Sequence, residues 1–174
     1  MDSLKELNQK LESSYKKLPL VSKPEDIVPG EGSEKARILM IGEAPGYHES
    51  VQRRPFVGRS GQLLRKVIAE VGIDLKDVYI SNIVKARPPE NRDPTSAEIK
   101  AYKPFLDQEI EIIEPQLIVT LGRYSMYKFL PDVKISQVHG RLHRVEWAGK
   151  VVYVLPMYHP AAALRGTRVK EQFT

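Results

Sequence analysis

Residues 37–46 read Arg-Ile-Leu-Met-Ile-Gly-Glu-Ala-Pro-Gly, a continuous apolar run that ends at Gly42. Such a run is typical of a strand that is buried on both faces, as in a parallel sheet. The turn after it is rich in glycine and proline, so backbone N–H groups there can approach a ligand closely. It matches neither a Walker A sequence nor the GxGxxG fingerprint, which disfavours a nucleoside triphosphate or dinucleotide site. An ordinary strand-to-loop turn is the alternative interpretation.

Strands and helices are expected to alternate along the rest of the chain. Apolar patterns predict further strands at 78–84, 116–121 and 151–155, and helices at 2–17, 61–71, 95–114 and 124–130. The capping box Thr95-Ser-Ala-Glu98 opens the third of these helices. This alternation predicts an α/β fold, a three-layer α/β/α sandwich with a central, mainly parallel four-stranded sheet. At 174 residues the chain has the size of a single domain, spanning 1–174.

Composition and charge exclude several classes of protein. No apolar run approaches the ~20 residues of a membrane span, so no membrane partner is expected. The absence of cysteine excludes disulfides, thiolate metal sites and iron–sulfur clusters, and we expect neither a metal nor a cofactor. The N-terminus lacks the apolar core of a signal peptide, which makes the cytoplasm the expected location. The net charge of +5 lies wholly within residues 134–174, and such a basic end favours a polyanionic partner.

Polar residues stand at the carboxyl ends of the predicted strands, where parallel sheets bind their ligands. Glu43 follows the first strand, Asn82 interrupts the end of the second, and His159 follows the fourth. The Asn82 amide can present an acceptor and a donor that match N3–H and O4 of uracil and mismatch cytosine. A core asparagine satisfied by the backbone is the alternative. His159 can donate a hydrogen bond to a developing oxyanion, or it can be a structural histidine.

A loop aromatic and several cations complete the set of candidates. Phe56, in the loop Pro55-Phe-Val-Gly58, could stack on a flat base or plug the core. Arg54, Lys85 and Arg87 flank the expected crevice and could meet DNA phosphates, or they could be solvated surface charges.

Together these motifs resemble those of family-four uracil-DNA glycosylases. The resemblance follows the chain in order through Gly42-Glu-Ala-Pro-Gly46, Arg54-Pro-Phe-Val-Gly58, Gly61-Gln-Leu-Leu64, Ser81-Asn-Ile-Val-Lys85, Arg87-Pro-Pro-Glu-Asn-Arg92, Tyr158-His-Pro-Ala-Ala162 and Leu164-Arg165. It implies a monofunctional α/β/α enzyme that flips uracil out of DNA. Such an enzyme hydrolyses the N-glycosidic bond and leaves an abasic site and free uracil.

The resemblance also implies roles for individual residues. Phe56 stacks on the flipped base, Asn82 reads its pyrimidine edge, and His159 stabilises the negative charge that gathers on O2. Glu43 positions or polarises water and offsets the cationic sugar. The residues implied to line the base site are Gly42, Ala44 and Glu49, the last near C5, where it disfavours thymine; those implied to contact DNA are Arg54, Lys85, Arg87, Leu164 and Arg165.

One departure from the family concerns a metal cluster. The family typically binds a [4Fe–4S] cluster through four cysteines, and the matching positions here are Tyr15, Leu18, Ala86 and Tyr102. We expect Tyr15, Leu18 and Tyr102 to form an apolar plug that holds the N-terminal helix where the cluster would sit. Burial of a few hundred Å² would contribute several kcal/mol, so the loss affects stability more than chemistry.

A second departure concerns the wedge that fills the hole left by a flipped base. Relatives often have leucine at the position of Ala163, and here Leu164 or Arg165 is expected to act instead. This predicts weaker strand invasion and a preference for single-stranded substrate.

The leading interpretation is a monomeric glycosylase of base excision repair that acts on uracil in single- or double-stranded DNA. One alternative is a superfamily glycosylase for hypoxanthine or xanthine, and another is a DNA-binding module that has lost catalysis. A small-molecule nucleotide enzyme is disfavoured because phosphate-binding motifs are absent and the C-terminal segment is basic.

Overall fold

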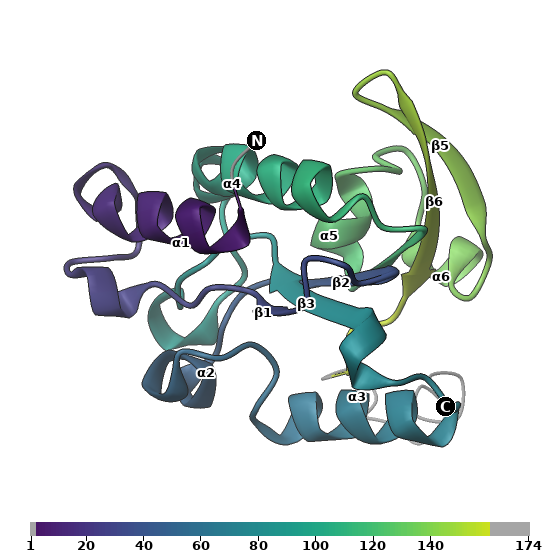
Figure 1. The fold of residues 1–174 in the computed structure, drawn as a ribbon, viewed down its shortest axis with the longest axis horizontal. Helices are drawn as coiled ribbons and strands as arrows, with labels where there is room; N and C mark the ends of the chain where they lie inside the picture. The colour runs from purple at the N-terminus through teal and green to yellow at the C-terminus, as the bar shows by residue number, and fades with distance from the viewer. Residues whose placement is uncertain (1–2, 161–174) are drawn as a thin grey trace.

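The computed structural model describes residues 3–160, which form helices on both faces of one sheet (Figure 1). The strands pair in the order β1-β3-β2-β4-β6-β5. They are β1 (Glu31–Gly32), β2 (Ile38–Gly42), β3 (Val78–Asn82), β4 (Leu117–Leu121), β5 (His143–Trp147) and β6 (Lys150–Met157). The helices are α1 (Leu4–Ser13), α2 (Tyr47–Gln52), α3 (Arg59–Glu70), α4 (Ser96–Ile113), α5 (Arg123–Tyr127) and α6 (Ile135–Val138). Short 3₁₀ turns are η1 (Tyr15–Lys17), η2 (Pro24–Asp26), η3 (Leu75–Asp77) and η4 (Pro89–Asn91).

The central strands are the ones that the sequence predicts. β3, β2, β4 and β6 run parallel, and Ile38 of β2 pairs with Val78 on one side and with Leu117 on the other. The prediction of a mainly parallel α/β core is confirmed. The expected count of four strands is wrong, because an antiparallel strand is added at each edge.

The two edge strands lack the signal that identified the others. β1 is two residues long and lies in a segment rich in proline and glycine. β5 alternates half-buried and exposed residues, so no continuous apolar run identifies it. It joins β6 through Ala148 and Gly149, whose φ angles of 50° and 78° fit a type I′ hairpin turn. Ala-Gly is not among the common sequence signals for that turn, which favour Asn-Gly and Asp-Gly.

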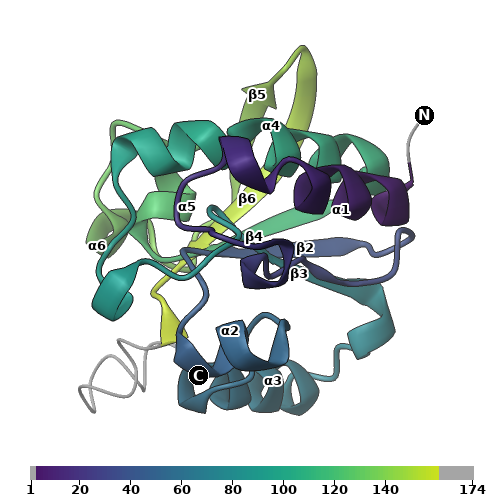
Figure 2. The same ribbon diagram turned by 90° about the vertical axis from the view of Figure 1, so that its left-hand side faces the viewer.

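Helices cover the sheet in two layers (Figure 2). On one face, Leu7 of α1 and Leu106 of α4 share a core cluster with Ile41 of the sheet. On the other face, Leu64 of α3 packs with Met40. The three-layer sandwich is therefore confirmed. Among the described residues, no helix combines the length and the apolar character needed to cross a membrane.

Packed side chains occupy the four positions at which the family that the sequence resembles has the cysteines of its [4Fe–4S] cluster. Ala86 and Tyr102 are fully buried, and Leu18 packs against the same core cluster as α1. The Tyr102 hydroxyl donates a hydrogen bond of 2.7 Å to the carbonyl of Pro19, and Tyr15 is half-buried in η1. These side chains provide no thiolate ligand, so a [4Fe–4S] cluster does not fit here. The predicted plug is confirmed for Leu18 and Tyr102, and iron in the purified protein would contradict it.

The predicted capping box at the start of α4 is present and is tied to an arginine. Thr95 and Glu98 exchange hydrogen bonds of 3.2 and 2.8 Å, and Arg92 donates to both carboxylate oxygens of Glu98 at 2.8 Å. The hydrogen bonds from Arg92 are the main reason that the pKa of Glu98 falls from its usual 4.5 to about 2. Glu98 is therefore ionised in the folded protein well below the pH at which it would protonate in the unfolded chain.

This shift predicts an acid-dependent part of the stability. A carboxyl group whose pKa is lower in the folded state stabilises fully above its unfolded pKa, and this contribution is lost as the pH falls through its folded pKa. We expect the melting temperature to fall between pH 4.5 and about 2, and Glu98→Gln to flatten the profile in that window. Glu111→Gln, at an exposed position of the same helix, is the matched control. An unchanged slope in Glu98→Gln would contradict the prediction.

Candidate active site

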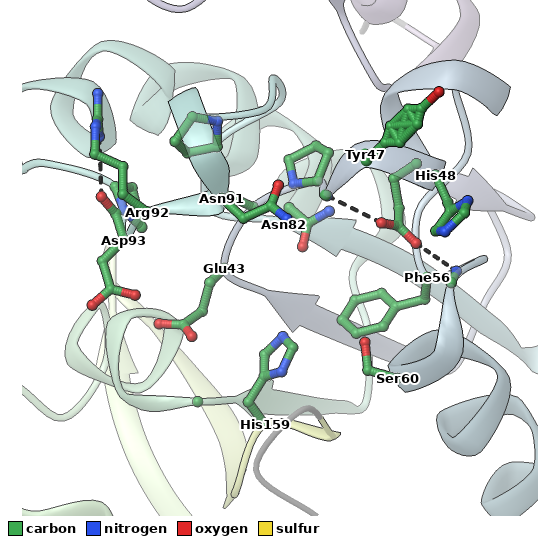
Figure 3. Close-up of a pocket in the computed structure, with 18 of the residues that line it drawn as sticks. Glu43, Tyr47, His48, Phe56, Ser60, Asn82, Asn91, Arg92, Asp93 and His159 are labelled. Atoms are coloured by element: carbon green, nitrogen blue, oxygen red, sulfur yellow. Dashed lines mark hydrogen bonds between the residues drawn. The ribbon is translucent and has the colours of Figure 1, made fainter. Parts of the chain in front are cut away.

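A cavity of about 760 Å³ opens at the carboxyl ends of the parallel strands (Figure 3). Glu43 follows β2, Asn82 ends β3 and His159 follows β6, and all three line this cavity. Figure 3 shows the carboxylate, the amide and the imidazole around the same space. The prediction that these distant segments meet is confirmed, because parallel strands bring their carboxyl ends to one edge of a sheet.

The amide of Asn82 is buried and incompletely bonded. The residue is only 3% exposed, and its Oδ1 has no hydrogen-bond partner within residues 3–160. A buried acceptor without a partner costs about 1–3 kcal/mol. This is the opposite of a core asparagine satisfied by its backbone, and it indicates that a ligand completes the bonding.

Gly42, the last residue of β2, leaves room for two side chains that line the cavity. A Cβ at this position would lie 2.4 Å from the Phe56 ring and 2.5 Å from Asn82 Oδ1. Only glycine therefore allows the aromatic ring and the amide to sit against the end of β2. Gly42 itself is not among the residues that line the cavity, whereas Ala44, two residues later, is.

Glu43 lies against the turn after β4. A Cβ on Gly122 would lie 3.0 Å from the carboxylate carbon of Glu43, and Gly122 has a φ of 98°. Both the close approach and the positive φ favour glycine at this turn. The carboxylate of Glu43 is thereby placed across the cavity from the segment that carries Phe56 (Figure 3).

Phe56 forms one wall of the cavity. Its ring centroid lies 5.7 Å from that of His159, with the two planes inclined by 30°. Its backbone has a φ of 52°, a left-handed conformation that is strained for a bulky residue. Gly61 of α3 permits this conformation, because a Cβ there would lie 2.0 Å from the Phe56 carbonyl carbon. Arg65 adds a hydrogen bond of 2.9 Å to the Phe56 carbonyl oxygen.

Glu49 ties the loop after β2 to the loop that carries Phe56. One carboxylate oxygen accepts a hydrogen bond of 3.1 Å from the N–H of Gly46. The other accepts from the N–H groups of Val57 and Gly58 at 2.9 and 2.7 Å. Glu49 also lines the cavity, so the prediction that it disfavours thymine stays open. The bonds give it a positioning role that the sequence did not indicate.

This arrangement predicts a loss of activity when Glu49 changes. In Glu49→Gln, one acceptor oxygen becomes an NH₂ group that faces a backbone donor, at a cost of about 1–3 kcal/mol. We expect the Phe56 loop to loosen and kcat/KM for the reaction that the resemblance implies to fall about tenfold. Glu25→Gln, an exposed glutamate of η2, is the control for loss of one charge. Wild-type kcat/KM in a folded Glu49→Gln protein would contradict the positioning role.

Lys85 does not face the cavity, and its predicted contact with DNA is wrong. The residue is 1% exposed, and its ammonium pairs with Glu109 of α4 and with Ser81. The side chain points into the layer between β3 and α4, where a charge must be paired. Glu109 lies on the buried face of α4. A carboxylate among the apolar residues of a helix indicates a buried cation as its partner, and this feature of the sequence could have identified the pairing with Lys85.

The other cations predicted to contact DNA differ from Lys85 in their exposure and in their partners. Arg54 is exposed and its Nε lies 2.6 Å from Glu31, and neither residue is among those that line the cavity. Burial would raise the pKa of Glu31, but hydrogen bonds from Arg54 and Arg65 outweigh it and lower that pKa. Arg87 is not among the residues that line the cavity, but its Nε donates a hydrogen bond of 2.7 Å to Asn91, which is one of them. Leu164 and Arg165 lie outside the described residues.

The opposite rim of the cavity was not predicted from the sequence. Arg92, Asp93 and Arg123 line it, and Arg123 pairs with Asp93 at 3.2 Å. Arg123 lies two residues after the end of β4, so the rule that pointed to Glu43 and His159 could have found it as well. Within residues 3–160, no group of three or more His, Asp or Glu side chains is placed to hold a metal ion.

Comparisons with known proteins agree with this geometry. The family model described as the uracil DNA glycosylase superfamily matches residues 29–174. The Type-4 uracil-DNA glycosylase of Sulfurisphaera tokodaii is 42% identical over 177 aligned positions, which cover 98% of this chain and 80% of that protein. The Type-4 enzyme of Archaeoglobus fulgidus is 40% identical, covering 99% of this chain and 89% of that protein. The Type-4 enzyme of Thermotoga maritima is 44% identical, covering 84% and 76%.

Proposed function

This chain belongs to the uracil-DNA glycosylase superfamily, and we propose that it is a DNA repair enzyme that removes uracil from DNA by hydrolysing the N-glycosidic bond. The observation that supports uracil as the base is the buried Asn82 amide, whose Oδ1 lies beside the Phe56 ring and has no partner in the part of the chain that the structure describes. In the proposed complex, Oδ1 accepts from N3–H of uracil and Nδ2 donates to O4. Cytosine presents the reverse pattern at both atoms and is rejected.

Bond cleavage in this proposal separates charge, and two side chains stabilise the two ends. The bond from C1′ to N1 breaks with its electron pair on the base, so negative charge gathers on O2 and positive charge on the sugar. His159 donates a hydrogen bond to O2, and Glu43 faces the sugar. Water adds to C1′ through its oxygen and gives a proton to Glu43. Glu43 later releases that proton to solvent, and the uracil anion takes up one proton from solvent, so the net reaction is hydrolysis. The products are an abasic site and free uracil.

Extrusion of the base is the other energetic requirement. Flipping costs a few kcal/mol, and stacking on Phe56 together with backbone contacts offsets that cost. Arg54 and Arg87 are proposed to contact the DNA backbone, and Arg87 is the one bonded to a residue that lines the cavity, Asn91. The proposed enzyme acts as a monomer.

The proposal is tested by a base-release assay on fluorescent oligonucleotides that carry uracil, hypoxanthine or xanthine, in single and double strands, with alkali cleavage of abasic sites. We expect uracil release by the wild type and a loss of about a hundredfold in kcat/KM in Asn82→Ala, because both base contacts disappear. Gln9→Ala, an exposed amide on α1, is the matched control. Release of a purine but not uracil would assign a different base, and no release at all would indicate a binding module.

A further inference from the structure

Tyr47 is a large aromatic residue left open at the edge of the cavity. It begins α2, is 51% exposed, and lines the same cavity as Asn82 and Phe56. Figure 3 shows it near His48, outside the space enclosed by Asn82, Phe56 and His159. Nothing in the proposed reaction uses its ring.

The ring of Tyr47 is held by a cation from another segment. The guanidinium carbon of Arg87 lies 5.5 Å from the ring centroid, within the range of a cation–π contact. Arg87 is in turn held by Asn91, whose Oδ1 accepts its Nε–H at 2.7 Å. The ring and the guanidinium therefore form a pre-arranged pair that is joined to the loop after β3.

The loop that carries Asn91 has a strained backbone. Glu90 and Asn91 have φ angles of 56° and 57°, two consecutive non-glycine residues in the left-handed region. For Glu90 this conformation costs about 1–2 kcal/mol, whereas asparagine adopts it more readily, and strain of this kind clusters at ligand-binding positions. Here the strain places the Asn91 side chain where it holds Arg87 over the tyrosine.

The cavity also has more room than one base needs. Its volume of about 760 Å³ lies in the upper half of the range that holds whole drug-sized ligands. Proteins that bind single-stranded nucleic acid combine exposed aromatic rings, on which bases stack, with arginines that track the backbone. Tyr47 and Arg87 provide one of each, beside the proposed uracil site.

We propose that Tyr47 and Arg87 form a second base-binding subsite, in which the DNA base next to the extruded uracil stacks on the open part of the Tyr47 ring. The inference rests on the proposed function. Stacking is tolerant of sequence, because every base has a flat face. A paired neighbour would first have to leave the duplex stack, so the subsite favours single-stranded substrate.

The test removes one base from the substrate and the ring from the enzyme. Three single-stranded uracil oligonucleotides are compared: one complete, one lacking only the base 5′ to uracil, and one lacking only the base 3′ to it, with the sugar and phosphate kept. For the wild type, we expect one of the two deletions to lower kcat/KM by about five- to hundredfold. For Tyr47→Ala, the complete substrate should fall by a similar factor and the same deletion should have no further effect.

Two variants serve as controls. Tyr47→Phe keeps the flat ring and should respond to the deletion as the wild type does. Tyr153→Ala removes a tyrosine of β6 that is 44% exposed and is not among the residues that line the cavity, so it should also behave as the wild type. Melting temperatures check that each variant is folded.

The outcomes separate this inference from the proposed function. If base deletion has the same effect in the wild type and in Tyr47→Ala, or no effect in either, the subsite is wrong even though uracil is released. A Tyr47 surface that serves a protein partner would give that same result. If the wild type releases uracil from none of the three oligonucleotides, the proposed function fails first.

Discussion

Glu43→Gln should lower the rate of uracil excision by about 10²- to 10⁴-fold while the affinity for uracil-containing DNA stays nearly unchanged. The substitution keeps the shape of the side chain beside Gly122 but removes the negative charge. A neutral amide neither offsets the cationic sugar nor accepts a proton from water, and both effects arise only in the transition state. Single-turnover rates with enzyme in excess measure the chemical step, and fluorescence anisotropy measures binding.

A second glutamate controls for loss of charge alone. Glu146 is exposed on β5 and is not among the residues that line the cavity, so Glu146→Gln should retain the wild-type rate. If Glu43→Gln were as fast as Glu146→Gln, the carboxylate would have no part in the reaction. A parallel loss of DNA affinity in Glu43→Gln would instead point to a role in binding.

His159→Ala is expected to have the next largest effect, a fall of about 10²- to 10³-fold in the rate of excision. Removal of the imidazole leaves the developing charge on O2 without its donor. His159→Gln keeps an N–H donor and should lose less. Because the ring of His159 lies 5.7 Å from that of Phe56, the melting temperature of each variant is measured as a check on the cavity wall.

The identity of the leaving base gives this prediction a chemical control. Fluorine at C5 withdraws electrons and stabilises the departing anion, so 5-fluorouracil depends less on a donor at O2. We therefore expect a smaller loss for His159→Ala with 5-fluorouracil than with uracil. Equal losses on both bases would mean that His159 acts on something other than the charge of the base.

Much of the fold was accessible from local patterns. The parallel strands and the helices α1, α3 and α4 were predicted near their observed bounds, because periodicity records which faces of an element are buried. The rule for parallel sheets then placed Glu43, Asn82 and His159 around one cavity. The edge strands β1 and β5 were missed, since a short strand and an alternating one carry weak signals.

For one residue of the predicted site, the sequence did not reveal the direction of the side chain. Lys85 directly follows the strand predicted at 78–84, and its charge suggested a contact with DNA, whereas the structure places it against Glu109. A cation near a strand end can turn toward either face of the sheet. Which face it takes depends on the helix that covers the strand, and Glu109 lies 24 residues further along the chain.

The alternation of apolar and polar residues, together with the strand-end motifs, was sufficient for the architecture and for three of the side chains proposed to act in the reaction. These features are local, so each segment carries its own evidence. The tertiary structure alone revealed that Glu49 joins two loops, that Lys85 is a core residue, and that Arg87 holds Tyr47 at the rim. Each of these depends on which distant backbone or side chain meets a polar group. The partner of each polar group is decided by how the helices and the sheet pack together. The periodicity of a single segment carries no information about that packing.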